Sequence, residues 1–203
     1  MVKIKIMPKK DGDKTHARIL EIAEKLFSEK GFDATSIDNI SKVVGINKAT
    51  IYYHFKDKKD IIMSLFTNIL TELEGYLEND AKADKNIREK ISQEITYMKS
   101  KRKILSVLMM EAMKDFGSDV SLFSCADMVI KGELKASGQR LDELDSKAKD
   151  YLYVFEFFSG FIPMITYVIF EEKWCEFFEC NNESLLNNFI DIFHKTHLEF
   201  HNI

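Results

Sequence analysis

The sequence predicts an all-α protein with a small N-terminal three-helix domain and a larger C-terminal helical domain. Helix-breaking residues are scarce, since the 203 residues include 8 glycines and 2 prolines. Apolar residues recur at the helical spacing of three and four along most of the chain, and no strand-like alternation bounded by turn pairs stands out. A hydrophobic fraction of 45% supplies a sizeable core. We therefore expect a soluble globular protein built from helices.

The first predicted helix covers residues 14–30. Ile19, Ala23 and Phe27 lie on one face of this helix, at the spacing of one turn. Gly31 follows the last apolar position, and glycine is common just after helices because it adopts left-handed backbone angles without strain. The helix should therefore end just before this glycine.

Two short helices follow, joined by a tight turn at Gly45. The first of them should begin after Thr35 as its N-cap, with Asp38 three residues later as the partner in a capping box. The second should cover residues 48–54, with Asn47 as its N-cap. Two short helices joined in this way form a helix-turn-helix.

A long fourth helix should begin after Asp57, with Asp60 at its third position and an apolar stripe from Ile61 to Leu77. Gly117 and Ser118, the stretch ASGQRLDELD and the stretch CNNES mark breaks in the remainder. Beyond the fourth helix we expect helices near residues 85–100, 102–116, 119–136, 145–172 and 183–201.

The stretch from Tyr151 to Phe170 contains 20 residues with a single charge, at Glu156. This length matches a bilayer span. Gly160 and Pro163 weaken a spanning helix, however, and acidic residues rather than lysine or arginine follow directly. We favour the alternative of a helix buried in a bundle or in a subunit interface.

Cysteine usage and the N-terminus indicate a cytoplasmic protein. The lysines among residues 1–14 are not followed by a long apolar segment or a small-residue cleavage site, so no secretory signal is predicted. Cys125, Cys175 and Cys180 are odd in number and form no CxxC pair, which suits reduced thiols.

Charge is unevenly distributed along the chain. Residues 1–59 contain 13 Lys and Arg against 8 Asp and Glu, whereas the remainder contains 16 against 25. A basic N-terminal part on an acidic body indicates a polyanionic partner for that part alone, although a solvated lysine-rich surface is the alternative.

Residues 17–62, ARILEIAEKLFSEKGFDATSIDNISKVVGINKATIYYHFKDKKDII, closely resemble the DNA-binding domain of TetR-family transcriptional regulators. The shared features, in order, are a helix ending in Leu-Phe, then Gly-Phe, Thr, Ile-Ser, Gly-Ile, and Tyr-Tyr-His-Phe followed by Lys. The resemblance implies a homodimer that binds a DNA operator through residues 1–59, with residues 1–13 as a possible flexible arm. It also implies that residues 60–203 form a helical ligand-binding and dimerisation domain.

In a helix-turn-helix, the N-terminal end of the second helix lies closest to base edges in the major groove. Lys48 can donate to guanine there, while the methyls of Ala49 and Thr50 can contact thymine. The lysines at and after the motif, and the hydroxyls before the first short helix, are expected to contact phosphates. The predicted DNA contacts are Thr35, Ser36, Asn47, Lys48, Ala49, Thr50, Tyr52, Tyr53, His54, Lys56 and Lys58.

Several residues of this region have structural alternatives. Ile40, Ile51 and Phe55 are predicted core residues, and one of the two tyrosines is a candidate for the core as well. His54 has no nucleophile or carboxylate pair at a recognisable spacing, so we predict no catalytic site and no enzyme. The lysines of residues 1–13 either contact the DNA backbone or stay solvated.

The second domain is rich in Phe, Met and Tyr, which can line an adaptable apolar pocket, although ordinary core is the alternative for each. Glu111 and Glu156 are candidates for facing a cationic ligand, against the alternative of exposed or paired carboxylates. Residues 151–170 and 185–200 are the predicted dimer interface. The candidate pocket residues are Met109, Glu111, Met113, Phe123, Glu156 and Phe157.

His194, His197 and His201 share one helical face near the C-terminus, a spacing at which imidazoles can bind a metal. The alternative is a terminal helix whose histidines suit the negative end of its dipole. No closed ligand set is evident, so we predict neither a metal site nor a cofactor.

Taken together, these features predict a cytoplasmic, homodimeric, ligand-responsive transcriptional regulator, most simply a repressor that a small apolar or amphipathic effector releases from its operator. A DNA-binding protein without a small-molecule effector is the alternative.

Overall fold

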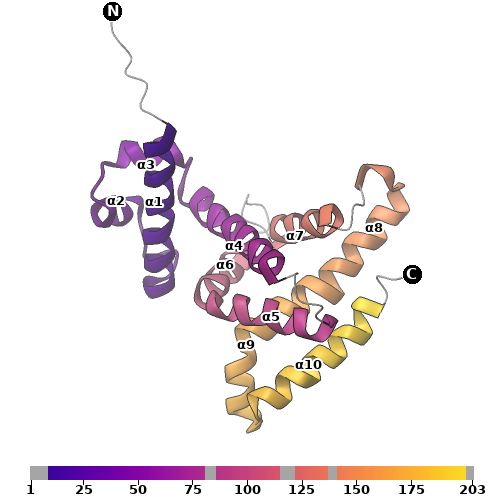
Figure 1. Ribbon diagram of the computed structural model, residues 1–203. Coiled ribbons are helices and arrows are strands. Elements are labelled where there is room, and N and C mark those ends of the chain that lie inside the picture. The colour runs from indigo at the N-terminus through magenta and orange to yellow at the C-terminus, as the bar shows by residue number, and fades with distance from the viewer. Residues whose placement is uncertain (1–8, 81–85, 115–121, 137–140, 200–203) are drawn as a thin grey trace, which may run out of the picture. The chain divides into compact units, whose positions relative to one another are not determined.

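A computed structural model of the chain describes residues 9–80, 86–114, 122–136 and 141–199. Helices make up most of these residues, and no strand occurs among them, which confirms the all-α prediction. The chain divides into two compact units, Met1–Phe66 and Thr67–Ile203. The division lies within helix α4 (Lys58–Asp80), so one helix belongs to both units (Figure 1).

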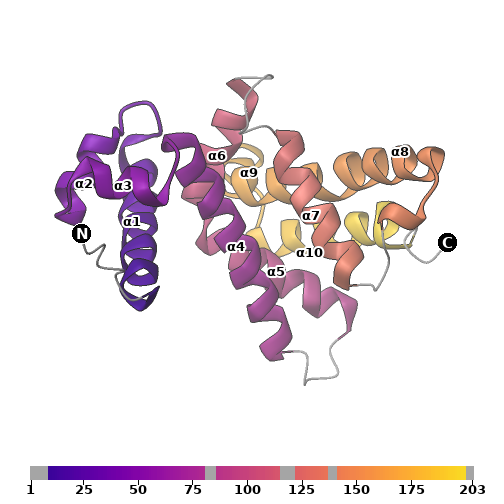
Figure 2. The ribbon, with the colours of Figure 1, turned by 90° about the horizontal axis from the view of Figure 1, so that it is seen from above.

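The first unit contains α1 (Lys9–Lys30), α2 (Ile37–Val44), α3 (Lys48–His54) and the beginning of α4. Helices α1 to α3 pack side by side (Figures 1 and 2). Helix α1 starts five residues before the predicted position, so residues 9–13 of the expected arm are helical, while residues 1–8 lie outside the described residues. The side chains that fill the core include Ile19, Ala23, Phe27, Ile40, Ile51, Phe55, Ile61 and Ile62.

The predicted start of α2 was wrong by one residue. Ser36, not Thr35, is the N-cap: its hydroxyl accepts the backbone N–H of Asn39 at 3.1 Å, and the Asn39 side chain accepts the Ser36 N–H at 2.9 Å. Asp38, the predicted capping partner, instead forms ion pairs with two lysines. Serine is the better N-cap of the two, and the Thr35 hydroxyl donates instead to the carbonyls of Leu26 and Gly31.

The second unit continues α4 and adds α5 (Ile87–Ser100), α6 (Arg102–Lys114), α7 (Leu122–Ala136), the 3₁₀ turn η1 (Leu141–Glu143), α8 (Ser146–Phe155), the π-helical segment η2 (Glu156–Phe161), α9 (Ile162–Phe178) and α10 (Asn182–Thr196). The helix expected at 145–172 is therefore a longer run with a π-helical interruption, and it ends at Phe178. Helix α10 returns alongside η2 and α9 and ends before the predicted residue 201 (Figures 1 and 2).

The run from Ser146 to Phe178 has the length and composition of a membrane span, and it is the only such run among the described residues. Of the most apolar 18-residue stretch of this run, 39% is buried inside the protein. The run packs against α6, α5 and α10, as a core helix of a helical domain does.

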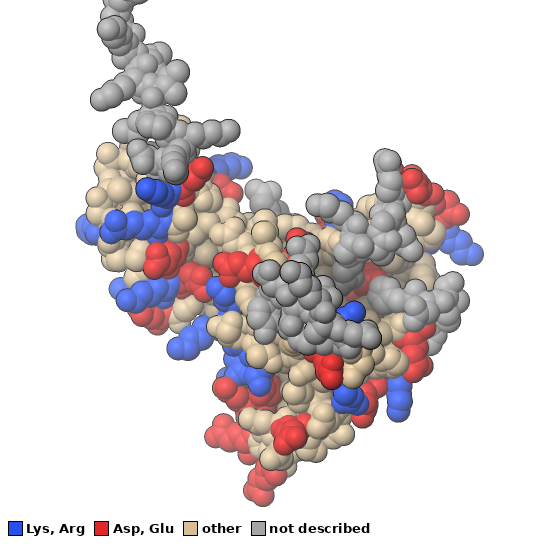
Figure 3. Space-filling model, in the orientation of Figure 1, with Lys and Arg blue, Asp and Glu red and all other residues tan. Residues whose placement is uncertain are grey.

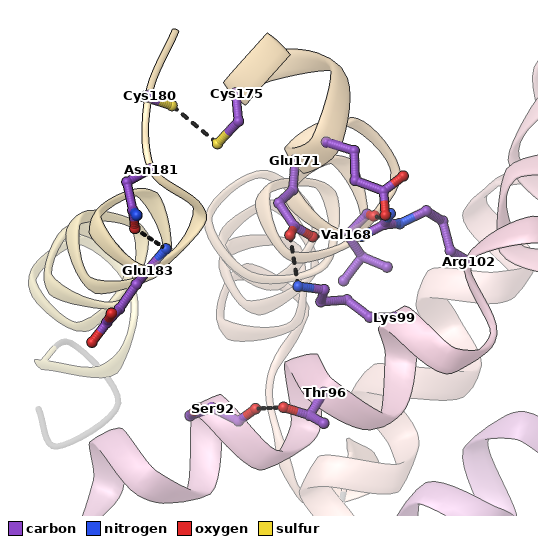
Figure 4. A network of polar contacts seen from close by, with 11 residues as sticks. Ser92, Thr96, Lys99, Arg102, Val168, Glu171, Cys175, Cys180, Asn181 and Glu183 are labelled. Atoms are coloured by element: carbon purple, nitrogen blue, oxygen red, sulfur yellow. Dashed lines mark hydrogen bonds and ion pairs between the residues drawn. The ribbon is translucent and has the colours of Figure 1, made fainter. Parts of the chain in front are cut away.

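A buried ion-pair cluster joins α9 to α5 and α6 (Figure 4). The Glu171 side chain is only 1% exposed. Its carboxylate accepts hydrogen bonds from the Lys99 ammonium at 2.6 Å and from the Arg102 guanidinium at 2.5 Å. Arg102 also donates from Nε to the Val168 carbonyl at 2.7 Å and pairs with Glu172. No sequence pattern indicates this cluster, because Lys99 and Arg102 are about 70 residues from Glu171 in the chain.

Candidate nucleic-acid interface

The turn between α2 and α3 is held by local hydrogen bonds. Gly45 has a φ of 80° in the left-handed region, and its N–H donates to the Ser41 carbonyl at 2.9 Å. Asn47 then caps α3, since its side-chain oxygen accepts the Thr50 N–H at 2.8 Å and the Thr50 hydroxyl at 2.9 Å. Both features match the prediction from sequence, and they set the direction in which α3 leaves the turn.

One face of α3 anchors the helix and the opposite face meets solvent. Ile51 and Phe55 are buried in the core of the first unit. Tyr52 is 55% exposed and Tyr53 is 84% exposed, so neither tyrosine belongs to the core. Among the described residues of this unit, only Val43 on α2 is another exposed large apolar side chain. Exposed aromatic rings in this position favour a surface that contacts a partner.

The polar residues at the start of α3 share this exposure. Asn47, Lys48 and Ala49 are exposed, and Thr50 is half-buried because its hydroxyl belongs to the cap. Lys42 and Val43 on α2 are exposed too, although neither was among the predicted DNA contacts. They fall just outside the apolar stripe of α2, which is the signal that places a residue on the outer face.

Lys48 is held in place by Asp38 on the preceding helix. Its Nζ lies 3.0 Å from the carboxylate, which Lys42 also contacts at 2.6 Å. Hydrogen bonds from Lys42 and then from Lys48 hold the pKa of Asp38 below its ordinary value. Exposed ion pairs of this kind contribute little to stability, so an acceptor on DNA can replace the carboxylate easily.

His54 lies at the end of α3 among other rings. Its ring centroid is 5.1 Å from that of Tyr53 and 5.9 Å from that of His16. Burial, and then the nearby His16, lower the pKa of His54 below 6.5. The lowered pKa favours the neutral imidazole, which can still donate a hydrogen bond.

Two predicted phosphate contacts have internal roles in the first unit. Thr35 is fully buried, and its hydroxyl donates to the Gly31 carbonyl at 2.9 Å and to the Leu26 carbonyl at 3.3 Å. The Lys58 ammonium donates to the carbonyls of Phe32 at 2.7 Å and Thr35 at 2.9 Å. It also lies 4.1 Å from the centre of the Phe32 ring. Thr35 is therefore no longer among the proposed DNA contacts. Lys58 connects α4 to the segment between α1 and α2.

We expect Lys58→Met to lower the free energy of unfolding by about 1 to 3 kcal/mol, because two part-buried carbonyls lose their donor. Lys56→Met is the matched control, since Lys56 is exposed two residues away. That control should leave stability unchanged and reduce the salt dependence of DNA binding by about one unit of slope. Urea unfolding and binding titrations at several salt concentrations measure both. A stable Lys58→Met protein with a reduced salt slope would restore Lys58 to the phosphate contacts.

Charge alone does not outline the interface. On the face shown in Figure 3, lysine and arginine side chains of the first unit are interspersed with acidic ones. The candidate surface is therefore defined by the exposed and half-buried residues of α3, together with its N-cap, the N-cap of α2 and the lysine just after α3. Its members are Ser36, Asn47, Lys48, Ala49, Thr50, Tyr52, Tyr53, His54 and Lys56.

The structure brings together only part of the predicted pocket in the second unit. The rings of Phe123 on α7 and Phe157 on η2 are 5.5 Å apart, but Phe123 and Met113 are exposed. The Glu111 carboxylate accepts the Lys114 ammonium at 2.6 Å, and Met109 is half-buried on the same helix.

Glu156 is buried, as expected for a pocket residue, but it faces His197 at 3.6 Å. The His197 ring is also buried, 3.0 Å from the Ser159 hydroxyl and stacked on Phe155. The carboxylates proposed to face a cationic ligand therefore have partners within the protein.

The three C-terminal histidines do not form one face around a metal in the described part of the chain. His194 lies 3.3 Å from Glu199, whereas His197 points inward to Glu156. His201 lies outside the described residues. Among the residues that are described, no group of three or more potential ligands is close enough to hold a metal ion.

Sequence comparison identifies the first unit. A model of the family described as bacterial regulatory proteins, tetR family, matches residues 19–65. The HTH-type transcriptional regulator AcrR of Shigella flexneri is 40% identical over 77 residues, which are 36% of this chain and 35% of AcrR. IcaR of Staphylococcus epidermidis, a negative transcriptional regulator of the biofilm operon icaADBC, is 52% identical over 60 residues, which are 30% of this chain and 32% of IcaR. The chain thus matches about a third of the length of these curated relatives.

Solved structures resemble a larger part of the chain. A regulator of the TerR/AcrR family from Aquifex aeolicus VF5 covers 87% of this chain and 96% of its own, with a TM-score of 0.57 and 19% identity. FadR of Bacillus subtilis in complex with stearoyl-CoA covers 88% and 97%, with a TM-score of 0.51 and 19% identity. These TM-scores show a common fold, in which a helix-turn-helix unit is followed by a larger helical unit. Over residues 19–65, the chain is thus similar to the tetR family of bacterial regulatory proteins.

Proposed function

We propose that this chain is a cytoplasmic transcriptional repressor that binds operator DNA as a homodimer and releases it when a small apolar or amphipathic molecule binds the second unit. The observation that carries the DNA-binding part is the outer face of α3. Its two tyrosines are exposed while Ile51 and Phe55 on the same short helix are buried. A helix anchored on one side and aromatic on the other suits insertion into the major groove.

Lys48 and Tyr52 supply the test of this proposal. Lys48→Ala and Tyr52→Ala should each weaken binding to the operator by about 1 to 3 kcal/mol, because each removes a contact in the groove. Both side chains are exposed, so the melting temperature should not change. Titrations at fixed salt with DNA from upstream of the protein's own gene measure the affinity. Lys25→Ala, an exposed lysine on α1, is the control that should bind as the unmodified protein does.

Wild-type affinity in both the Lys48 and the Tyr52 variants would contradict the proposal that α3 binds in the major groove. Equal weakening by the Lys25 variant would do the same, since it would mean that general charge rather than α3 governs binding.

The proposed homodimer is supported by the apolar side chains that the helices from α8 to α10 leave exposed. These helices cannot cover the aromatic rings that point away from them. A second copy of the chain can cover those rings with its own matching faces. The exposed large apolar residues of this region are Tyr151, Val154, Phe158, Phe170, Trp174, Phe177, Phe178 and Ile192.

The proposed effector is supported by the interior of the second unit. The Tyr167 hydroxyl is buried without a hydrogen-bond partner among the described residues, and burial raises the pKa of Tyr167 to about 12. A buried hydroxyl without a partner costs about 1 to 3 kcal/mol, which a ligand with a polar group can recover. FadR of Bacillus subtilis, which shares the fold, was solved with stearoyl-CoA.

The alternative function is DNA binding without any effector. Thermal stabilisation by fatty acyl compounds or other amphipathic ligands separates the two, because a ligand that binds only the folded state raises the melting temperature. Release of DNA by the same ligand would support a shift in the population of two arrangements, with α4 as the connecting helix. A ligand that binds while DNA affinity stays unchanged would contradict that mechanism.

A further inference from the structure

The end of α9 brings two cysteines together. Cys175 lies in the last turn of the helix, and Glu179, just after it, has a φ of 52° in the left-handed region. The backbone N–H of Cys180 donates to the Cys175 carbonyl at 3.1 Å. This is the bond of a Schellman motif, in which the side chains of the two bonded residues meet across the helix end.

In most such motifs the two side chains form an apolar contact, but here both are thiols. The Cys180 Sγ lies 3.0 Å from the Cys175 Sγ and donates its hydrogen to it (Figure 4). A disulfide needs a sulfur separation of about 2.05 Å, so side-chain rotation and a small local adjustment bring the atoms into bonding distance. The backbone motif already holds the two residues together before any oxidation.

The two thiols differ in accessibility. Cys175 is buried, and burial raises the pKa of its thiol to about 11. Cys180 is half-buried, so an oxidant reaches it first. Cys125 is fully buried in α7, and burial raises the pKa of its thiol to about 12. A more accessible sulfur beside a buried one is the arrangement of an attacking and a resolving cysteine.

We propose that Cys175 and Cys180 are a redox-modification site that forms a reversible intramolecular disulfide with a peroxide as oxidant. The Cys180 thiol loses its proton, the thiolate attacks one peroxide oxygen and the O–O bond breaks. The leaving hydroxide takes up that proton, so a sulfenic acid and one water result. The Cys175 sulfur then attacks the Cys180 sulfur, the S–S bond forms, and the hydroxyl leaves with the Cys175 proton as a second water. Two thiols are oxidised by two electrons, and one hydrogen peroxide is reduced to two waters.

The disulfide would join the end of α9 to the start of the connection to α10. That connection is short, since Asn181 already caps α10 by accepting the backbone N–H groups of Glu183 and Ser184. The site goes beyond the proposed function and does not depend on DNA binding. Its test uses covalent chemistry and is independent of any operator or effector.

The full-length protein, purified in the reduced state, is treated with hydrogen peroxide and blocked with iodoacetamide. Protease cleavage after glutamate at Glu176 and Glu179 separates the two cysteines in the chain. We expect peptides that remain linked until dithiothreitol is added. The intact mass, measured before the iodoacetamide step, should be lower by two hydrogen atoms. Cys125→Ser should form the same link, whereas Cys180→Ser should form none.

Three results would overturn the proposal. One is a link between two chains through Cys180 in place of the intramolecular bond. Another is Cys180 oxidised to sulfinic acid while Cys175 keeps its free thiol. The third is three free thiols at a peroxide concentration that oxidises glutathione under the same conditions. Circular dichroism on the serine variants verifies that the loss of the link does not reflect unfolding.

Discussion

Replacing Arg102 with methionine is expected to lower the free energy of unfolding by about 3 kcal/mol, because it leaves a buried carboxylate with half of its partners. Glu171 is 1% exposed and is held by Arg102 at 2.5 Å and Lys99 at 2.6 Å. The Val168 carbonyl also loses its donor. Methionine retains the apolar stem, so the loss reflects charge and hydrogen bonding rather than a large cavity.

Urea unfolding at a fixed protein concentration measures the effect, since the apparent stability of the proposed dimer would depend on concentration. Arg88→Met is the matched control: Arg88 pairs with Asp191 on α10, and both side chains are largely exposed. Exposed pairs contribute about 0 to 1 kcal/mol. If the Arg102 variant lost no more stability than this control, the buried cluster would not be a major source of stability.

Gly160→Ala is expected to destabilise the second unit by about 1 to 3 kcal/mol, the usual cost of inserting a methyl into a packed core. A Cβ at this position would lie 2.6 Å from Cε1 and 2.8 Å from Nε2 of His197. The imidazole cannot easily move aside, because it is buried, stacked on Phe155 and within hydrogen-bond distance of Ser159. The closeness of η2 to α10 therefore requires glycine.

The control is Gly75→Ala in α4, where a Cβ would meet nothing within 4 Å. Alanine is the better helix former, so this variant should gain about 0.5 to 1 kcal/mol. His197→Ala should remove much of the penalty of Gly160→Ala in the double variant, since it removes the clashing ring. Melting curves of the single and double variants measure the coupling. Additive losses would mean that the ring and the methyl do not meet.

The helix-turn-helix was predictable because its signals are local. Asn47 caps α3, Gly45 takes left-handed angles, and α3 covers residues 48–54 as expected. Each of these features depends on neighbours within four residues along the chain. The one-residue error at Thr35 arose because Thr35 and Ser36 are both good caps, and only the carbonyls of Leu26 and Gly31 distinguish them.

The sequence by itself determined the all-helical class, the position of the helix-turn-helix and the resemblance of the first unit to the tetR family. Helix periodicity, caps and the motif all depend on neighbouring residues. Only the tertiary structure decided which polar residues have their partners inside the protein. Lys58 and Glu171 find their partners many residues away, and the contact between Cys175 and Cys180 depends on the backbone angles of Glu179. Hydrogen bonds and ion pairs act over a few ångströms in space, so chain distance does not predict them.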